Sequence, residues 1–154
     1  MKLWANGFFI KAYKLYEVGL LDEAFTWFLR GAKAGNTSCM LWVGILYGDG
    51  VRPDLLNINE IIWYKRAWKK HDSTALNNLA IVYKNQRKFE RAEKWFKIAI
   101  ENGDGDSNLE LAKMYINMSK PNGIIKDLLE ATINSDSATE ASIEEAQDLL
   151  AKYA

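Results

Sequence analysis

The chain is poor in the residue types on which many active sites depend. Its 154 residues include one cysteine, Cys39, and one histidine, His71. A single cysteine cannot form a disulfide within the chain, and a usual zinc site needs several cysteine or histidine ligands. Cys39 precedes the apolar residues 40–42, so we interpret it as a small core residue, and His71 as a cation at a helix end. We therefore expect no metal site, no cofactor and a reducing compartment.

Long apolar runs and net charge are lacking too. No apolar segment approaches the roughly 20 residues of a membrane span, and the apolar stretch 3–10 is too short for a signal peptide. Lys plus Arg and Asp plus Glu each number 20, which gives no general attraction to nucleic acid or anionic membranes. We expect a cytoplasmic protein. The charges are nevertheless uneven, because residues 65–97 carry ten basic and three acidic residues and 101–154 carry four and eleven.

Candidate catalytic motifs are incomplete. Asp104, Asp106 and Asn108 resemble the start of a calcium loop, but Leu109 and Tyr115 stand where such a loop has its glycine and glutamate. The segment 48–50 lacks the further glycines, lysine and hydroxyl residue of a phosphate loop. Neighbouring carboxylates along a helix point in different directions. We therefore predict no catalytic residues and no enzyme activity.

Aromatic landmarks recur along the chain. Tryptophan–aromatic pairs begin at positions 36 and then 32 residues apart, at Trp27, Trp63 and Trp95. Three tyrosines keep the same two steps, and each follows a small residue by three positions: Gly44 and Tyr47, Ala80 and Tyr83, Ala112 and Tyr115. A fixed step of this size is typical of repeat proteins.

Each unit has the apolar spacing of two helices. One stripe is formed by Leu76, Leu79, Ala80 and Tyr83, and a second stripe by Ala92, Phe96 and Ala99. The small residues allow paired helices to approach while large aromatic residues fill the gap beside them. Because one hairpin cannot bury both faces, we expect neighbouring hairpins to stack.

These motifs resemble two related families of helical repeats. The third unit, Leu76-x-x-Leu79-Ala80-x-x-Tyr83 followed by Ala92-x-x-x-Phe96-x-x-Ala99, is similar to the tetratricopeptide pattern, with leucine in place of its opening tryptophan. The second unit resembles the Sel-like repeat, through Gly44, Tyr47, Gly48, Gly50, Val51, Asp54, Trp63, Tyr64 and Ala67. The first unit fits with either Leu15 or Tyr16 at the tyrosine position, and the fourth places Ile124, Leu128 and Ala131 in its second helix.

The prediction is a single all-α domain, an α-solenoid of about four helix-turn-helix repeats at about 4–35, 36–71, 72–104 and 105–135. Helix pairs are expected at 4–18 with 21–34, 37–47 with 58–70, 73–85 with 88–102, and 107–118 with 122–134. A capping helix follows at about 140–153, with Ser142 and Glu145 as a capping box, although a partner-binding tail is the alternative.

The resemblance also implies a binding surface, because the first helix of each pair lines the groove in which partners of such repeats lie. The predicted groove positions are Phe9, Tyr13, Tyr16, Leu41, Ile45, Asn77, Ile81, Lys84, Glu110, Lys113 and Asn117. Trp4 and Trp42 fit either packing or a role as surface anchors. Tyr13 or Ile45 could instead pack against the next hairpin.

Three functions remain open at this stage. The first is an adaptor that binds a peptide or folded protein, and the second is a bacterial immunity protein that neutralises a toxin. The third is RNA binding, which the basic region 65–97 favours and the absence of a regular pair of base-reading side chains disfavours. Whether the groove or region 65–97 meets the partner, and the oligomeric state, are not determined by the sequence.

Overall fold

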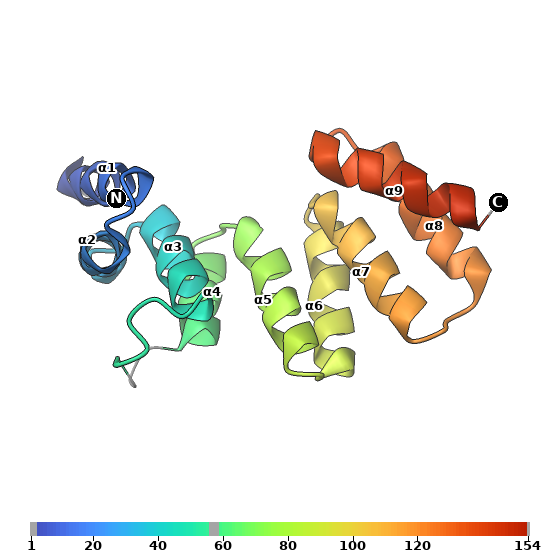
Figure 1. The fold of residues 1–154 in the computed structure, drawn as a ribbon, viewed down its shortest axis with the longest axis horizontal. Helices are drawn as coiled ribbons and strands as arrows, with labels where there is room; N and C mark the ends of the chain where they lie inside the picture. Colours follow the sequence, from blue (N-terminus) through green and yellow to red (C-terminus); the bar gives the residue numbers. More distant parts are fainter. Residues whose placement is uncertain (1–2, 56–58, 154) are drawn as a thin grey trace. The chain divides into compact units, whose positions relative to one another are not determined.

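The computed structural model describes residues 3–55 and 59–153, and of residues 3–5 it describes the backbone only. These residues form nine α-helices and no β-strand (Figure 1). The chain divides into two compact units, Met1–Ala75 (unit 1) and Leu76–Ala154 (unit 2), which are considered separately below. The helices lie within two or three residues of the predicted ranges, which confirms the all-α prediction.

Unit 1 consists of two helical hairpins. Its helices are α1 (Leu3–Glu17), α2 (Leu21–Lys33), α3 (Thr37–Gly48) and α4 (Glu60–Lys69), and each packs against the next. Helix starts are fixed by asparagine side chains, since Asn36 accepts a 2.9 Å hydrogen bond from the Cys39 amide and Asn59 one from the Ile61 amide. Gly19 and Gly35 adopt positive φ between helices, where glycine is favoured.

Unit 2 contains the remaining helices. They are α5 (Thr74–Asn85), whose first two residues are grouped with unit 1, α6 (Phe89–Glu101), α7 (Asp106–Asn117), α8 (Asn122–Ile133) and α9 (Glu140–Lys152). α6 packs on α7, α7 on α8, and α8 on α9. α9 covers α8 with a narrow apolar stripe centred on buried Ala146, while Glu144, Gln147 and Asp148 are exposed.

The structure decides between the two possible registers of the first repeat. Ala12 is fully buried and Tyr13 is exposed. The small residue of the motif is therefore Ala12, and Leu15 occupies the position that Tyr47 holds in the second repeat.

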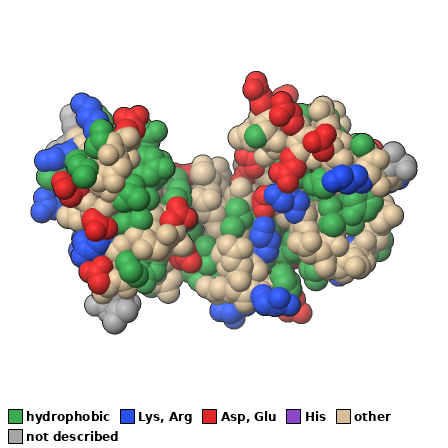
Figure 2. All heavy atoms as spheres, viewed as in Figure 1, with side chains coloured by type: hydrophobic (Ala, Val, Ile, Leu, Met, Phe, Trp, Pro, Cys, Tyr) green, Lys and Arg blue, Asp and Glu red, His purple; other side chains and the backbone are tan. Residues whose placement is uncertain are grey.

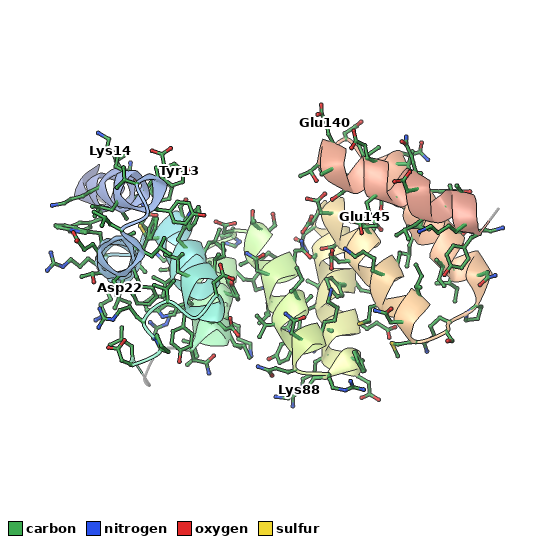
Figure 3. The ribbon with its side chains drawn as sticks, viewed as in Figure 1. Tyr13, Lys14, Asp22, Lys88, Glu140 and Glu145 are labelled. Carbon is green, nitrogen blue, oxygen red and sulfur yellow. The ribbon has the colours of Figure 1, made fainter. Side chains whose placement is uncertain are left out.

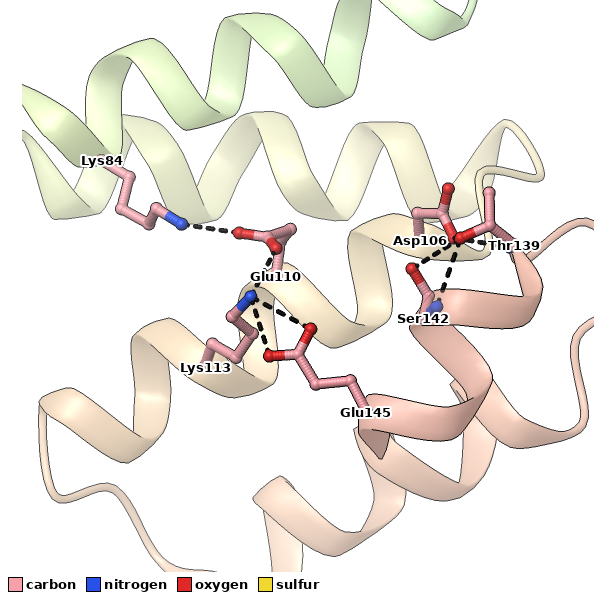
Figure 4. Close-up of polar contacts among 7 residues, drawn as sticks. All are labelled: Lys84, Asp106, Glu110, Lys113, Thr139, Ser142 and Glu145. Carbon is pink, nitrogen blue, oxygen red and sulfur yellow. Dashed lines mark hydrogen bonds and ion pairs between the residues drawn. The ribbon is translucent and has the colours of Figure 1, made fainter. Parts of the chain in front are cut away.

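Two local predictions are wrong. In α8 the buried residues are Ile125, Leu129 and Thr132, one position later than predicted, because the exposed face of the helix carries apolar side chains as well. The N-cap of α9 is Thr139 rather than Ser142. The Thr139 amide donates a 2.8 Å hydrogen bond to Asp106 of α7, which sets the start of α9 (Figure 4).

Among the residues that the structure describes, there is no helix with the length and apolarity of a membrane span. Cys39 lies in the core as predicted, fully buried against Gly31 of α2.

Candidate partner-binding surface

The predicted groove positions of unit 1 lie on α1 and α3, and three of them belong to a group of packed aromatic rings. This aromatic cluster consists of Phe9, Tyr13, Tyr16, Phe28 and Trp42. The ring of Trp42 stacks on that of Phe28 with 5.3 Å between centroids and an interplanar angle of 6°. On its other sides Trp42 lies 4.6 Å from Tyr16 and 5.7 Å from Tyr13, centroid to centroid.

The aromatic cluster has a buried base and an accessible rim. Phe28 has no exposed surface, Phe9, Tyr16 and Trp42 are half-buried, and Tyr13 is 37% exposed. Tyr13 therefore packs against the next hairpin through Trp42 and also reaches the surface (Figure 3). Ring pairs with this spacing and tilt stabilise one another, so the rim is held in place before any partner arrives.

Further apolar side chains surround the aromatic cluster. Ile10, on the same helix as Tyr13, is 55% exposed, and Leu41 and Ile45, one turn apart on α3, are half-buried. Apolar side chains reach the surface of unit 1 in Figure 2. A small cavity of about 290 Å³ also opens between α1 and the start of α3, lined by Asn6, Phe9, Ile10, Asn36, Thr37 and Ser38.

Three of the predicted groove positions of unit 2 are charged and pair with one another. Lys84 Nζ lies 2.6 Å from Glu110 Oε2, and Lys113 Nζ lies 3.0 Å from Glu110 Oε1 and 3.1 Å from Glu145 Oε1 (Figure 4). We call these four residues the ion-pair network. The network links α5, α7 and α9. Its charges are paired with one another and are therefore less available to a partner.

Electrostatics favour the charged state of this network. Burial acts to raise the pKa of Glu110, but hydrogen bonds and charges from Lys84 and Lys113 outweigh it, so the pKa lies below its ordinary value. For Lys113 burial acts to lower the pKa, and Glu110 together with Glu145 raises it above its ordinary value. Each group thus keeps the other ionised near neutral pH.

The remaining groove positions of unit 2 differ in accessibility. Asn117 is exposed and Ile81 is half-buried. Asn77 is half-buried, and its side-chain oxygen is buried without a hydrogen-bond partner among the described residues. The side chain of Trp4, the other candidate anchor, lies outside the described residues.

Two participants were not predicted from the sequence. Phe28 lies on α2, and nothing in its spacing along the sequence indicated a stack with Trp42. Glu145 was assigned to the cap of α9, although it follows Lys113 by 32 residues, the shorter of the two repeat steps. This spacing could have indicated that Lys113 and Glu145 occupy equivalent positions, one on the first helix of the fourth repeat and the other on the helix that follows that repeat.

The possible metal ligands and the single thiol are considered next. Within the described ranges, no three His, Cys, Asp or Glu side chains come together as a metal site would require. Burial raises the pKa of the Cys39 thiol to about 12, which keeps this side chain protonated and poorly nucleophilic.

Comparison with known proteins finds relatives that match part of the chain. No protein-family model matches the chain. An F-box protein of Arabidopsis thaliana is 33% identical over 95 residues, which are 60% of this chain and 26% of that protein. A putative sel1-like repeat-containing protein of Acanthamoeba polyphaga mimivirus is 29% identical over 80 residues, 52% of this chain and 15% of that protein. The chain thus matches well under two thirds of either relative's length.

Two solved structures have a similar fold. A Sel1 repeat protein from Oxalobacter formigenes aligns over 97% of this chain and 74% of its own, with a TM-score of 0.65 and 17% identity. A protective antigen of uropathogenic Escherichia coli strains that displays an SLR fold aligns over 97% of this chain and 45% of its own, with a TM-score of 0.54 and 17% identity. The chain therefore has the helical-repeat fold of Sel1-like repeat proteins and is similar to such proteins in sequence.

Proposed function

We propose that the chain is a non-enzymatic, cytoplasmic module that binds a partner protein through the aromatic cluster of unit 1. Folds of Sel1-like repeats generally serve in protein–protein interaction. The observation that carries the proposal is the exposure of Tyr13, 37%, on rings that rest on fully buried Phe28.

An aromatic rim of this kind suits a binding hot spot. Tryptophan and tyrosine contribute large contact areas and are enriched among the residues that dominate interface energies. Because Trp42 and Tyr16 are already packed, they lose little conformational entropy when a partner binds. Neighbouring Ile10 supplies further apolar area at the surface.

The partner chemistry follows from the contrast between the two units. The ion-pair network of unit 2 already satisfies Lys84, Glu110 and Lys113, whereas Tyr13, at the rim of the aromatic cluster, keeps 37% of its surface exposed. We expect the partner to insert an apolar or aromatic side chain against Tyr13 and Trp42.

Site-specific photocrosslinking tests this proposal. A photoreactive phenylalanine analogue is placed at position 13, with position 18 as the matched control because Val18 is 70% exposed at the α1–α2 turn, outside the aromatic cluster. We expect position 13, and not position 18, to crosslink one protein in the source cell. A crosslink to RNA, or equal crosslinking at both positions, contradicts the proposal.

A substitution then measures the contribution of the ring. Tyr13→Ala should weaken binding of the crosslinked protein at least about tenfold, since losing a hot-spot side chain costs about 2 kcal/mol or more. If the protein is a toxin whose activity stops when this chain binds, the role is that of an immunity protein. If its activity continues in the complex, the role is that of an adaptor.

A further inference from the structure

The turn between α5 and α6 carries a group of basic side chains around a surface cavity. Arg87, Lys88 and Arg91 line a cavity of about 680 Å³ together with Phe89, Glu90 and Met118. We propose that this group, called the basic turn, is a second docking site, for an acidic protein segment that carries an apolar side chain. This site lies in unit 2 and does not use the aromatic cluster.

The three cations have no carboxylate partner in the described part of the chain, where the ion pairs involve other residues. Lys88, which projects from the turn in Figure 3, donates a 2.9 Å hydrogen bond to the neutral Gln86 side chain. The Arg87 and Arg91 guanidinium groups lie over the rings of Phe89 and Tyr83, each 5.8 Å from the centroid. Their positive charge is available to an incoming carboxylate.

The start of α6 adds to this positive potential. No side chain caps its N-terminus, as is also true of α2, α7 and α8. The first amide groups of a helix carry partial positive charge and lack partners within the helix. Glu90, in the first turn of α6, offsets only part of this positive charge, because three cations line the same cavity.

The left-handed backbone at Arg87 provides a matched variant for testing the proposal. Arg87 has φ 59°, in the left-handed region, and the turn is closed by hydrogen bonds from the Arg87 and Lys88 amides to the carbonyls of Lys84 and Tyr83. The corresponding turn of the first hairpin has Gly19, which adopts this conformation without strain. The turn between α7 and α8 has Ser119 in the same conformation, at φ 54°, so this backbone geometry is shared by turns of the repeats, and Arg87 places a cation in it.

The occupant is inferred from charge and shape together. Unpaired cations select an anionic partner, and the apolar walls provided by Phe89 and Met118 select one with an apolar side chain. A second copy of this chain, whose residues 101–154 are acidic, is the other anionic candidate, and the experiment distinguishes it.

The test measures binding of the full chain to a fluorescent, glutamate-rich peptide with one central leucine. We expect saturable binding that weakens steeply with salt, about threefold weaker after either Lys88→Gln or Arg91→Gln. Replacing the leucine of the peptide by glycine should weaken binding too. Lys65→Gln, an exposed lysine of unit 1, and Tyr13→Ala should leave it unchanged, which separates this test from that of the aromatic cluster.

Arg87→Gly gives the sharpest result. It removes a cation and places glycine at a left-handed position, so we expect weaker peptide binding together with a melting temperature that is higher by about 2–4 °C. Unchanged peptide binding in Arg87→Gly, or in a Lys88→Gln and Arg91→Gln double variant, overturns the proposal. Tighter binding of a single-stranded RNA with the same number of charges does so as well. Self-association of the chain that disappears in the double variant assigns the basic turn to a second copy instead.

Discussion

A Cβ atom added to Gly44 of α3 would lie only 2.5 Å from Cε1 of Tyr64 on α4. The two helices of the second repeat are therefore close because one contributes no side chain and the other places a ring in the space. This contact explains why the repeat motif pairs a small residue in its first helix with an aromatic residue in its second.

Gly44→Ala should lower the free energy of unfolding by about 1–3 kcal/mol, because the ring of Tyr64 is 3% exposed and has little room to move. Urea unfolding measures the effect. The control is Gly7→Ala in α1, where a Cβ would meet nothing within 4 Å, and here we expect a gain of about 0.5–1 kcal/mol. Equal effects of the two substitutions would show that α3 and α4 are not packed in this way.

The register of α8 leads to a second prediction. Ile125 is 1% exposed and Ile124 is 48% exposed, so two adjacent isoleucines provide a matched pair. Ile125→Ala should destabilise the chain by about 2–5 kcal/mol and Ile124→Ala by less than about 1 kcal/mol. Thermal unfolding measures both losses of stability. A larger loss in Ile124→Ala than in Ile125→Ala would support the register predicted from the sequence instead.

These elements show which parts of the fold were predictable. Helix positions followed from apolar periodicity and from signals such as Asn36 and Gly35, which act within a few residues. The register predicted for α8 was wrong because this helix lacks the tryptophan–aromatic landmark of the other repeats. Without that landmark, Ile124 and Ile125 fit the repeat pattern equally well in the sequence. Only packing against α7 and α9 distinguishes them.

The candidate site was predictable only in part, for a related reason. The resemblance to helical repeats placed Tyr13 and Tyr16 on the predicted groove, and in the structure both rings pack against Trp42. The stack of Trp42 on Phe28 joins residues of different hairpins, and their relative rotation depends on how the hairpins pack. Spacing along the chain carries no information about that rotation.

The ion-pair network predicts a dependence of stability on pH. Because the pKa of Glu110 in the folded state lies below its unfolded value of about 4.5, the network stabilises the fold above that pH. The stabilisation is lost as the pH falls through the folded-state pKa. Glu110→Gln should therefore cost about 1–2 kcal/mol at neutral pH and much less in acid.

Urea unfolding of Glu110→Gln at several pH values tests this expectation, with Glu144→Gln on the exposed face of α9 as the control. The control should unfold like the unsubstituted chain at every pH. A loss in Glu110→Gln that is as large in acid as at neutral pH would mean that the side chain acts through its shape and not through its charge.

The buried thiol leads to the last prediction. Cys39 has no exposed surface, and burial raises its pKa to about 12, so both access and ionisation oppose reaction with a thiol reagent. At about pH 8 the folded chain should react with a disulfide reagent only as fast as it opens, and the urea-unfolded chain should react at once. Moving the thiol by one position, in a Cys39→Ala and Ser38→Cys double variant, should restore rapid labelling because Ser38 is exposed. Rapid and complete labelling of the unsubstituted folded chain would instead place Cys39 at a surface, and the contact between α2 and α3 at Gly31 could not then be as close as the structure has it.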